Sequence, residues 1–210
     1  MDRNIRIRRI ADDDWDGIVT LEAGAYTPLG LSEGRAALES KAWASPTTCF
    51  ALDVEHRLAG YLLALPYPEF AYPDLTRREE AVFHSRNLHL HDLVIAEDLR
   101  GRGFAKRLLS RLTTGARRQG YERISLVSVG GSHTFWSANG FMARQGVMNP
   151  GEYGASSVYM TMALPPRRPA RFGNPAPFGN PAPFGNPEPF GNPAAVGGRP
   201  GGTPSRDEVG

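Results

Sequence analysis

A glycine-rich turn at residues 99–105 joins a predicted buried strand to a predicted amphipathic helix, and this order favours folds that mix strands with helices. The strand covers Leu88 to Ile95, where apolar residues alternate before they run on without a break. The helix covers about Arg102 to Arg118, and four apolar residues recur in it at helical spacing: Phe104, Leu108, Leu109 and Leu112. The pattern therefore predicts a mixed α/β domain around this strand and helix.

The turn has the composition of an anion site. Gly101 and Gly103 lack a Cβ, so the backbone can adopt unusual dihedral angles and a ligand can approach closely. The free N–H groups of the first helical turn favour an anion, and Arg100 and Arg102 add positive charge. An ordinary strand-to-helix turn is the alternative. A Walker loop is excluded because no Gly-Lys-Ser/Thr ending is present, and a Rossmann fingerprint because the third glycine is missing.

Composition divides the chain near residue 164. Residues 165–210 are mainly Pro, Gly, Asn and Ala, so they cannot bury enough apolar surface to offset the entropy of ordering. We predict a folded domain at 1–164 and a disordered tail at 165–210. Four hexapeptide repeats of the form FGNPxx lie in the tail and begin at Phe172, Phe178, Phe184 and Phe190. They are interpreted as a flexible linker or, alternatively, as a regular Phe motif for a partner.

Charge and cysteine content exclude several classes of protein. The tail holds five arginines and three acidic residues, which leaves 19 basic and 19 acidic residues in the predicted domain. This balance gives no support for nucleic-acid binding. Cys49 is the single cysteine, so an intrachain disulfide or a cysteine-rich metal site is excluded. No stretch approaches 18 apolar residues, and we expect a cytoplasmic protein without membrane contact.

The remaining pattern supplies strands and helices on both sides of the turn. Helices are expected from Asp12 and over Glu33 to Trp43 and Ser132 to Asn139. Strands are expected at 5–9, 48–52, 58–65, 124–129 and 158–162, with the second and third paired as an antiparallel hairpin. Residues 66–86 form a long irregular connection with several prolines and aromatics, which is typical of a functional loop or, alternatively, of a surface insertion.

Three segments together resemble the acyl-CoA-binding core of the GCN5-related N-acetyltransferase (GNAT) superfamily. They are Arg100-x-x-Gly103-x-Ala105, the run 93–95 before it and Asn139-Gly140-Phe141 after it. The resemblance implies the GNAT fold: a central, mostly antiparallel sheet whose fourth and fifth strands splay apart, flanked by helices. It also implies acetyl-CoA or another acyl-CoA as cosubstrate, bound by Leu93, Val94 and Ile95 through the pantetheine arm and by Arg100, Gly101, Arg102, Gly103, Phe104 and Ala105 through the pyrophosphate.

Two histidines precede the pantetheine segment. His89 and His91 are two residues apart on a predicted strand, so their side chains are expected to point the same way, and imidazole titrates near neutrality. The stretch from His89 to Ile95 resembles the corresponding strand of arylalkylamine N-acetyltransferases, where paired histidines relay the substrate proton. Structural and metal-binding roles remain alternatives, although the sequence offers no evident third ligand. Asp92 is a candidate for binding the substrate ammonium, for orienting a histidine or for a structural role.

One position departs from the family pattern. Many GNAT members carry a tyrosine acid five residues before the phenylalanine of the Gly-Phe pair, where this chain has Trp136. Indole cannot supply that proton. Tyr153 is the first candidate to replace it, with Tyr159, Ser132 and His133 as others, and departure of CoA as a thiolate is a further alternative.

These features predict an acyl-CoA-dependent N-acyltransferase, expected to be an N-acetyltransferase, that acts on a primary amine of a small molecule by direct attack. Tyr67, Phe70 and Tyr72 are expected to line the acceptor pocket. No metal cofactor is expected, and the prediction allows for a homodimer. Two alternatives stay open: acetylation of a protein N-terminus or lysine, and a non-catalytic CoA-binding sensor or scaffold.

Overall fold

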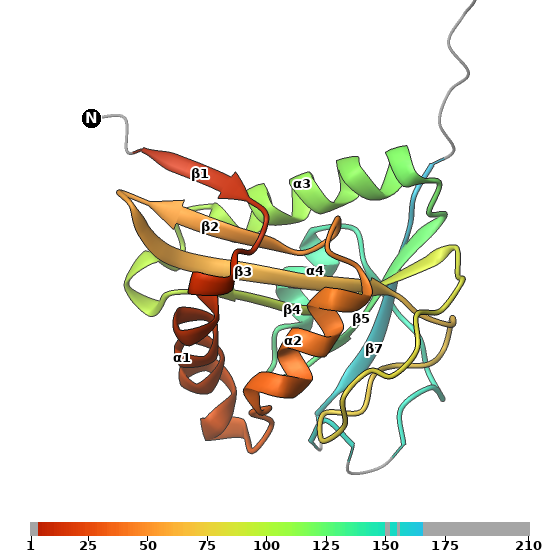
Figure 1. The fold of residues 1–210 in the computed structure, drawn as a ribbon. Helices are drawn as coiled ribbons and strands as arrows, with labels where there is room; N and C mark the ends of the chain where they lie inside the picture. Colours follow the sequence, from red (N-terminus) through yellow and green to blue (C-terminus); the bar gives the residue numbers. More distant parts are fainter. Residues whose placement is uncertain (1–3, 150–151, 155, 166–210) are drawn as a thin grey trace, which may run out of the picture. The chain divides into compact units, whose positions relative to one another are not determined.

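The strands and helices follow the predicted order, with short additional elements (Figure 1). The computed structural model describes residues 4–149, 152–154 and 156–165. The strands are β1 (Ile5–Arg8), β2 (Phe50–Val54), β3 (Arg57–Pro66), β4 (Asn87–Ile95), β5 (Arg123–Ser128), β6 (Met142–Ala143) and β7 (Val158–Ala163). The α-helices are α1 (Trp15–Tyr26), α2 (Arg35–Ala44), α3 (Phe104–Gln119) and α4 (His133–Ala138). Three short 3₁₀ turns accompany them: η1 (Asp12–Asp14), η2 (Thr27–Leu29) and η3 (Glu97–Leu99).

The described strands form one seven-stranded sheet in the order β1-β2-β3-β4-β5-β7-β6. All neighbours are antiparallel except β4 and β5, which are parallel. The predicted mixed α/β class with a mostly antiparallel sheet is confirmed. β4 and β5 pair only where Asn87–His89 face Arg123–Ser125. Beyond this short pairing the two strands separate, and the predicted splay is confirmed.

Helices cover both faces of the sheet (Figure 1). α1 and α2 pack on one face, where Ile18, Leu38 and Leu63 belong to a buried cluster. α3 packs on the other face, and its apolar stripe, which includes Leu108 and Leu112, joins the larger cluster of the core. A short helix is marginally stable until its apolar stripe is buried, so packing on the sheet stabilises α1, α2 and α3.

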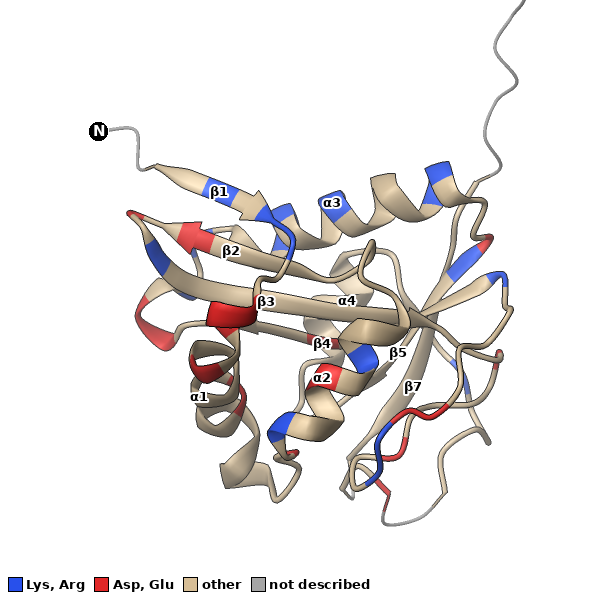
Figure 2. Ribbon diagram, in the orientation of Figure 1, with Lys and Arg blue, Asp and Glu red and all other residues tan. Residues whose placement is uncertain are grey.

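Charged residues of both signs are distributed around the sheet (Figure 2). Basic residues recur on the outer side of α3, whose last turn contains Arg117 and Arg118. Cationic side chains near a helix C-terminus interact favourably with the helix dipole, so these charges stabilise α3. Among the described residues, no helix combines the length and apolar character needed to cross a membrane.

The predicted boundary at residue 164 falls just after the last strand. β7 ends at Ala163, and Leu164 is buried and donates its N–H to Glu122 O at 2.7 Å. One compact unit, Met1–Pro169, holds every element named above. The four FGNPxx repeats and the predicted disordered tail lie outside the described residues.

Candidate active site

A cavity of about 600 Å³ opens where β4 and β5 separate. It lies between the end of β4, the turn before α3 and the segment that joins β5 to α4. Eight of the predicted cofactor residues line it: Leu93, Val94, Ile95, Arg100, Gly101, Gly103, Phe104 and Ala105. Arg102 does not line the cavity and is exposed on the surface. Residues of the sequence motif therefore line the cavity that opens where β4 and β5 separate.

The glycine turn has the backbone that an anion cradle requires. Gly101 and Gly103 have φ angles of +77° and +82°, a region that residues with a Cβ rarely adopt. A Cβ at either position would meet nothing within 4 Å, so the space beside the backbone is open. No side chain caps the start of α3. The first N–H groups of this helix therefore remain available to a ligand, and the helix dipole favours a negative one.

A β-bulge sets the position of His91. Asp92 pairs with Leu63 and Leu90 pairs with Ala64, so His91 is the extra residue between two consecutive pairs with β3. Bulges of this kind re-aim a side chain. His91 lines the cavity between β4 and β5. The rings of His89 and His91 lie near each other, with centroids 6.4 Å apart.

His89 is enclosed in the core beside β5 and β7. Its Nδ1 lies 3.1 Å from Ser125 Oγ, and its ring stacks on Tyr159 with centroids 6.4 Å apart. The side chain is buried, and this burial holds the pKa of His89 below its usual value, an effect to which the charge of His91 adds. His89 is therefore neutral near pH 7 and does not line the cavities described in this section.

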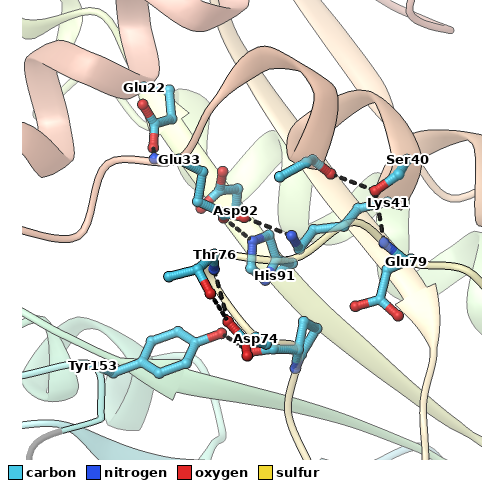
Figure 3. A network of polar contacts seen from close by, with 12 residues as sticks. Glu22, Glu33, Ser40, Lys41, Asp74, Thr76, Glu79, His91, Asp92 and Tyr153 are labelled. Atoms are coloured by element: carbon cyan, nitrogen blue, oxygen red, sulfur yellow. Dashed lines mark hydrogen bonds and ion pairs between the residues drawn. The ribbon is translucent and has the colours of Figure 1, made fainter.

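Glu33 joins His91 to a buried lysine, and Figure 3 shows its carboxylate directed at both. Its Oε1 lies 2.5 Å from His91 Nε2, and its Oε2 lies 2.5 Å from Lys41 Nζ. Lys41 has no exposed side-chain surface and Glu33 exposes only 3%. Burial acts to raise the pKa of Glu33, but His91 and Lys41 outweigh it and hold that pKa below its usual value. Glu33 is thus an anion fixed between two nitrogen groups.

The second ring nitrogen of His91 has no such partner. Nδ1 is buried and makes no hydrogen bond within the described part of the chain. The His91 side chain as a whole is only 1% exposed. A buried polar atom without a partner is uncommon in folded proteins and calls for an explanation. Nδ1 is therefore the ring nitrogen of His91 that other described residues leave without a hydrogen bond.

Asp92 forms a second buried carboxylate beside the histidine. It accepts a hydrogen bond from Tyr61 Oη at 2.9 Å and interacts with Tyr26. Burial raises the pKa of Asp92 above its usual value. Glu22 anchors the adjoining segment, since its two oxygens accept the Ser32 hydroxyl and the Glu33 N–H, both at 2.7 Å. The position of Glu33 is therefore held from its backbone as well as its side chain.

A narrow opening leads from His91 to a second cleft. The opening has a volume of about 20 Å³, and His91, Glu33, Asp92 and Tyr153 are among the residues that line it. The cleft beyond has a volume of about 630 Å³ and shares Glu33 and Tyr153 with the opening. His91 therefore lines both the first cavity and the narrow opening, and the opening shares Glu33 and Tyr153 with the second cleft.

Loop contacts close one side of this second cleft. Tyr153 Oη donates a hydrogen bond to Pro73 O at 2.5 Å, and Tyr72 Oη accepts the N–H of Asn149 at 3.2 Å while it contacts Glu152. These contacts tie the segment after β6 to the loop after β3. Burial raises the pKa of Tyr153 above its usual value.

Among the predicted acceptor residues, Tyr72 lines the second cleft, whereas Tyr67 and Phe70 do not. Tyr67 packs on Phe83 and His89, with ring centroids 4.7 and 6.0 Å away, and Phe70 is 55% exposed. The structure thus divides the three aromatic residues among three surroundings.

Trp136 lines the first cavity from α4. Its Nε1 donates to Ser132 Oγ at 3.2 Å, and its ring packs edge-on against Phe141. Ser132 Oγ in turn donates to Val129 O at 2.7 Å. The indole is thus a wall of the cavity, held by its own hydrogen bond. Tyr153 lies on the other side of His91, in the second cleft.

Three ionisable groups here have the spacing of metal ligands, which the sequence alone did not reveal. Glu33, His91 and Asp92 each offer one ligand atom, and these atoms lie within 4.8 Å of one another. The Lys41 ammonium, however, already contacts Glu33. Its positive charge opposes a second cation at the same carboxylate.

Sequence reasoning missed Glu33 and Lys41 as members of this site. For Lys41 a signal was present: it lies four residues after Ala37 and three after Leu38, on the apolar stripe of α2. A lysine on such a stripe must be buried or must end the stripe. Glu33 carried no comparable signal, because it precedes α2 and its position depends on tertiary contacts.

Comparisons with known proteins agree with this geometry. Residues 15–141 match the sequence profile of the family described as acetyltransferase (GNAT) family. A search of curated protein sequences found no match.

Solved structures share the fold at low sequence identity. Ard1 from Thermoplasma volcanium aligns with a TM-score of 0.62 and 16% identity over 76% of this chain and 97% of its own. The PaiA N-acetyltransferase from Thermoplasma acidophilum, in complex with coenzyme A, aligns with a TM-score of 0.56 and 13% identity over 76% of this chain and 99% of its own. N-acetylglutamate synthase from Neisseria gonorrhoeae, complexed with coenzyme A and N-acetyl-glutamate, aligns with a TM-score of 0.59 and 17% identity over 78% of this chain and 36% of its own.

Proposed function

The chain belongs to the acetyltransferase (GNAT) family, and we propose that it transfers a short acyl group, an acetyl group first, from acyl-CoA to a primary amine of a small molecule. One observation carries the proposal: two cavities meet at His91, whose Nδ1 is buried and unpartnered within the described residues. The predicted domain at 1–164 is proposed as the acyltransferase domain.

Acyl-CoA is proposed to occupy the cavity between β4 and β5. The open backbone at Gly101 and Gly103 suits the pyrophosphate, and the β5-facing side of residues 93–95 suits the amide groups of pantetheine. The coenzyme A complexes of the PaiA enzyme and of N-acetylglutamate synthase support this assignment by their shared fold. Acyl-CoA would supply a thioester, and the residues of this chain would supply its position.

A matched pair of alanine substitutions tests the cradle. Gly103 and Gly120 have similar φ angles, +82° and +85°, at the two ends of α3. Each change to alanine is expected to cost roughly 1–2 kcal/mol of stability, because a left-handed conformation is unfavourable for alanine. Only Gly103→Ala is expected to weaken acetyl-CoA binding, by about tenfold in calorimetric titration. Equal affinities in the two variants would contradict the cradle.

The amine must lose protons to react. An alkylammonium has a pKa near 10.4, so freeing its lone pair at pH 7 costs roughly 4–5 kcal/mol. His91 Nδ1 is proposed to accept one of these protons, while Glu33 stabilises the positive charge that forms on the ring. Over the whole reaction an ammonium and a thioester become an amide and a free thiol. The nitrogen loses two protons, of which one ends on sulfur and one passes to solvent.

The roles of His89 and Tyr153 are narrower proposals. His89 is neutral and 6.4 Å from the His91 ring, which suits a second relay position or support for that ring. Tyr153 is proposed to shape the acceptor cleft, because its hydroxyl is engaged with Pro73 O. With Trp136 as a wall of the first cavity, the CoA sulfur is proposed to leave as a thiolate and to be protonated afterwards.

The second cleft favours a small cationic acceptor. Its charged lining residues are three carboxylates and one guanidinium: Glu33, Asp74, Glu152 and Arg78. The contacts of Tyr153 and Tyr72 close one side of it, and its opening towards His91 is narrow. A peptide would need an open groove along its length, whereas an opening of about 20 Å³ has room only for a group the size of an ammonium.

A panel of acceptors tests this choice. Free-thiol release from acetyl-CoA is expected to be faster with small primary amines than with peptides that present an N-terminus or a lysine, by at least about tenfold in kcat/KM. A preference for peptides would establish the protein-modifying alternative. Acetyl-CoA binding without turnover on any acceptor would establish a non-catalytic sensor.

A further inference from the structure

Lys41 is buried inside the domain, close to the groups proposed to react. It lies on α2 and has no exposed side-chain surface. A buried ammonium without a partner is strongly unfavourable, so a lysine is kept there only where a carboxylate meets it. That carboxylate is Glu33, at 2.5 Å. Lys41 does not line the acyl-CoA cavity, the opening or the acceptor cleft.

Glu33 passes the effect of Lys41 to His91. One oxygen of Glu33 accepts from Lys41 and the other lies 2.5 Å from His91 Nε2. An ionised carboxylate only accepts hydrogen bonds, so Nε2 must carry the hydrogen of this contact. In a neutral imidazole the other nitrogen then carries a lone pair. That nitrogen is Nδ1, which is buried and unpartnered within the described residues.

From this geometry we infer that Lys41 is a positioning residue, which keeps Glu33 ionised and so fixes His91 in the Nε2–H form with its Nδ1 lone pair free for the amine proton. The inference rests on the proposed function for its catalytic consequence. The hydrogen position itself belongs to the resting protein and exists whether or not an acceptor is known.

Loss of Lys41 changes the balance of charge around Glu33. Burial then acts on Glu33 with only His91 to oppose it, so the carboxyl group takes up a proton at a higher pH. A protonated Glu33 can donate to Nε2, which moves the ring hydrogen to Nδ1 and removes the free lone pair. Lys41, Glu33 and His91 form a buried trio. Other ionisable groups that interact with members of this trio are unchanged by the substitution: Glu22 on α1, His89 and Asp92 on β4, and Asp74 and Glu79 in the loop after β3.

The first test reads the ring nitrogens directly. In ¹⁵N spectra of the full-length protein, neutral His91 is expected to carry its hydrogen on Nε2. In Lys41→Met the signal is expected to move towards the Nδ1–H form. A hydrogen on Nδ1 in the wild-type protein would overturn the inference, and this result does not require Lys41→Met to fold or any acceptor to be known.

The second test is a double-mutant cycle in kcat with the best small amine. Lys41→Met is expected to lower kcat about 10- to 100-fold, to leave the KM for acetyl-CoA within about twofold and to shift the rising limb of the pH profile to higher pH. In a Glu33→Gln background the same change is expected to lower kcat less than about threefold, because the carboxylate through which Lys41 acts is already absent. Arg118→Met removes an exposed cation at the end of α3 and is expected to leave kcat, KM and the pH profile unchanged.

The outcomes separate this inference from the proposed function. Equal losses from Lys41→Met in the wild-type and Glu33→Gln backgrounds would overturn it, as would an unshifted pH profile and tautomer in a folded Lys41→Met protein. Lys41→Arg keeps the cation and is expected to recover part of the lost kcat, which a purely steric role of lysine would not predict. Absence of turnover in the wild-type protein would instead contradict the proposed function and leave the ¹⁵N test decisive for Lys41.

Discussion

His91→Ala is expected to lower kcat about 10²- to 10⁴-fold, because it removes the base proposed to accept the amine proton. The affinity for acetyl-CoA is expected to stay within about threefold, since His91 is one of many residues that line the first cavity. Steady-state kinetics with a saturating small amine and a calorimetric titration of acetyl-CoA measure the two effects.

A second histidine provides the control for this result. His84→Ala removes an exposed imidazole that lines neither cavity at His91, and it is expected to leave kcat within about twofold. His89→Ala is expected to fall between the two, because His89 is neutral and packs beside the reacting group. A His91→Ala protein that keeps wild-type kcat would exclude His91 as the base.

Glu33→Ala is expected to destabilise the domain by about 3–5 kcal/mol, since it leaves the Lys41 ammonium buried without a counterion. The free energy of unfolding from urea titration measures this cost. Replacement of both partners, as in Glu33→Leu with Lys41→Met, is expected to restore most of the stability while activity stays low, because two apolar side chains leave no charge unpaired.

An exposed ion pair supplies the comparison. Arg57 and Asp98 form a salt bridge whose side chains are 58% and 62% exposed. Asp98→Ala is expected to change the free energy of unfolding by less than about 1 kcal/mol. If Glu33→Ala lowered the free energy of unfolding no more than Asp98→Ala does, water would have to reach the Lys41 ammonium. Lys41, Glu33 and His91 would then not form a buried cluster closed to solvent.

Local periodicity was sufficient to predict most of the fold. The apolar spacing of residues 102–118 predicted α3, observed at Phe104–Gln119, and the alternation before it predicted β4. These signals are strong because each element buries one continuous stripe. β6 was missed, since two residues, Met142 and Ala143, carry no measurable period. The motif predicted residues that line one wall of the first cavity, because the strand, the turn and the helix of that wall are adjacent in sequence.

The proton-handling part of the site depends on contacts that are distant in sequence. His91 was identified as a candidate, but its bulge arises from the pairing of β4 with β3, and register is set by tertiary structure. Glu33 reaches His91 across 58 positions of sequence. No local pattern encodes such a contact.

The aromatic residues of the 66–86 loop show a different limit. Tyr67, Phe70 and Tyr72 are all predicted to line the acceptor pocket, and of the three only Tyr72 lines the cleft proposed here for the acceptor. Phe70 has a φ angle of +65°, a backbone conformation that is uncommon for a residue with a side chain and that composition does not predict. Composition indicates that a loop is rich in aromatic residues, but the backbone angles decide where each side chain points.

The central claim is that acyl-CoA, held between β4 and β5, gives its acyl group directly to an amine that reaches His91 from the opposite cleft. Mass spectrometry of the reaction with isotope-labelled acetyl-CoA tests it most directly. The account predicts one labelled acetyl group on the amine for each CoA thiol released, an unlabelled protein, and an initial rate at least about 100-fold lower in His91→Ala. A labelled protein that passes its acetyl group to the amine, or thiol release that does not depend on the amine, would contradict it.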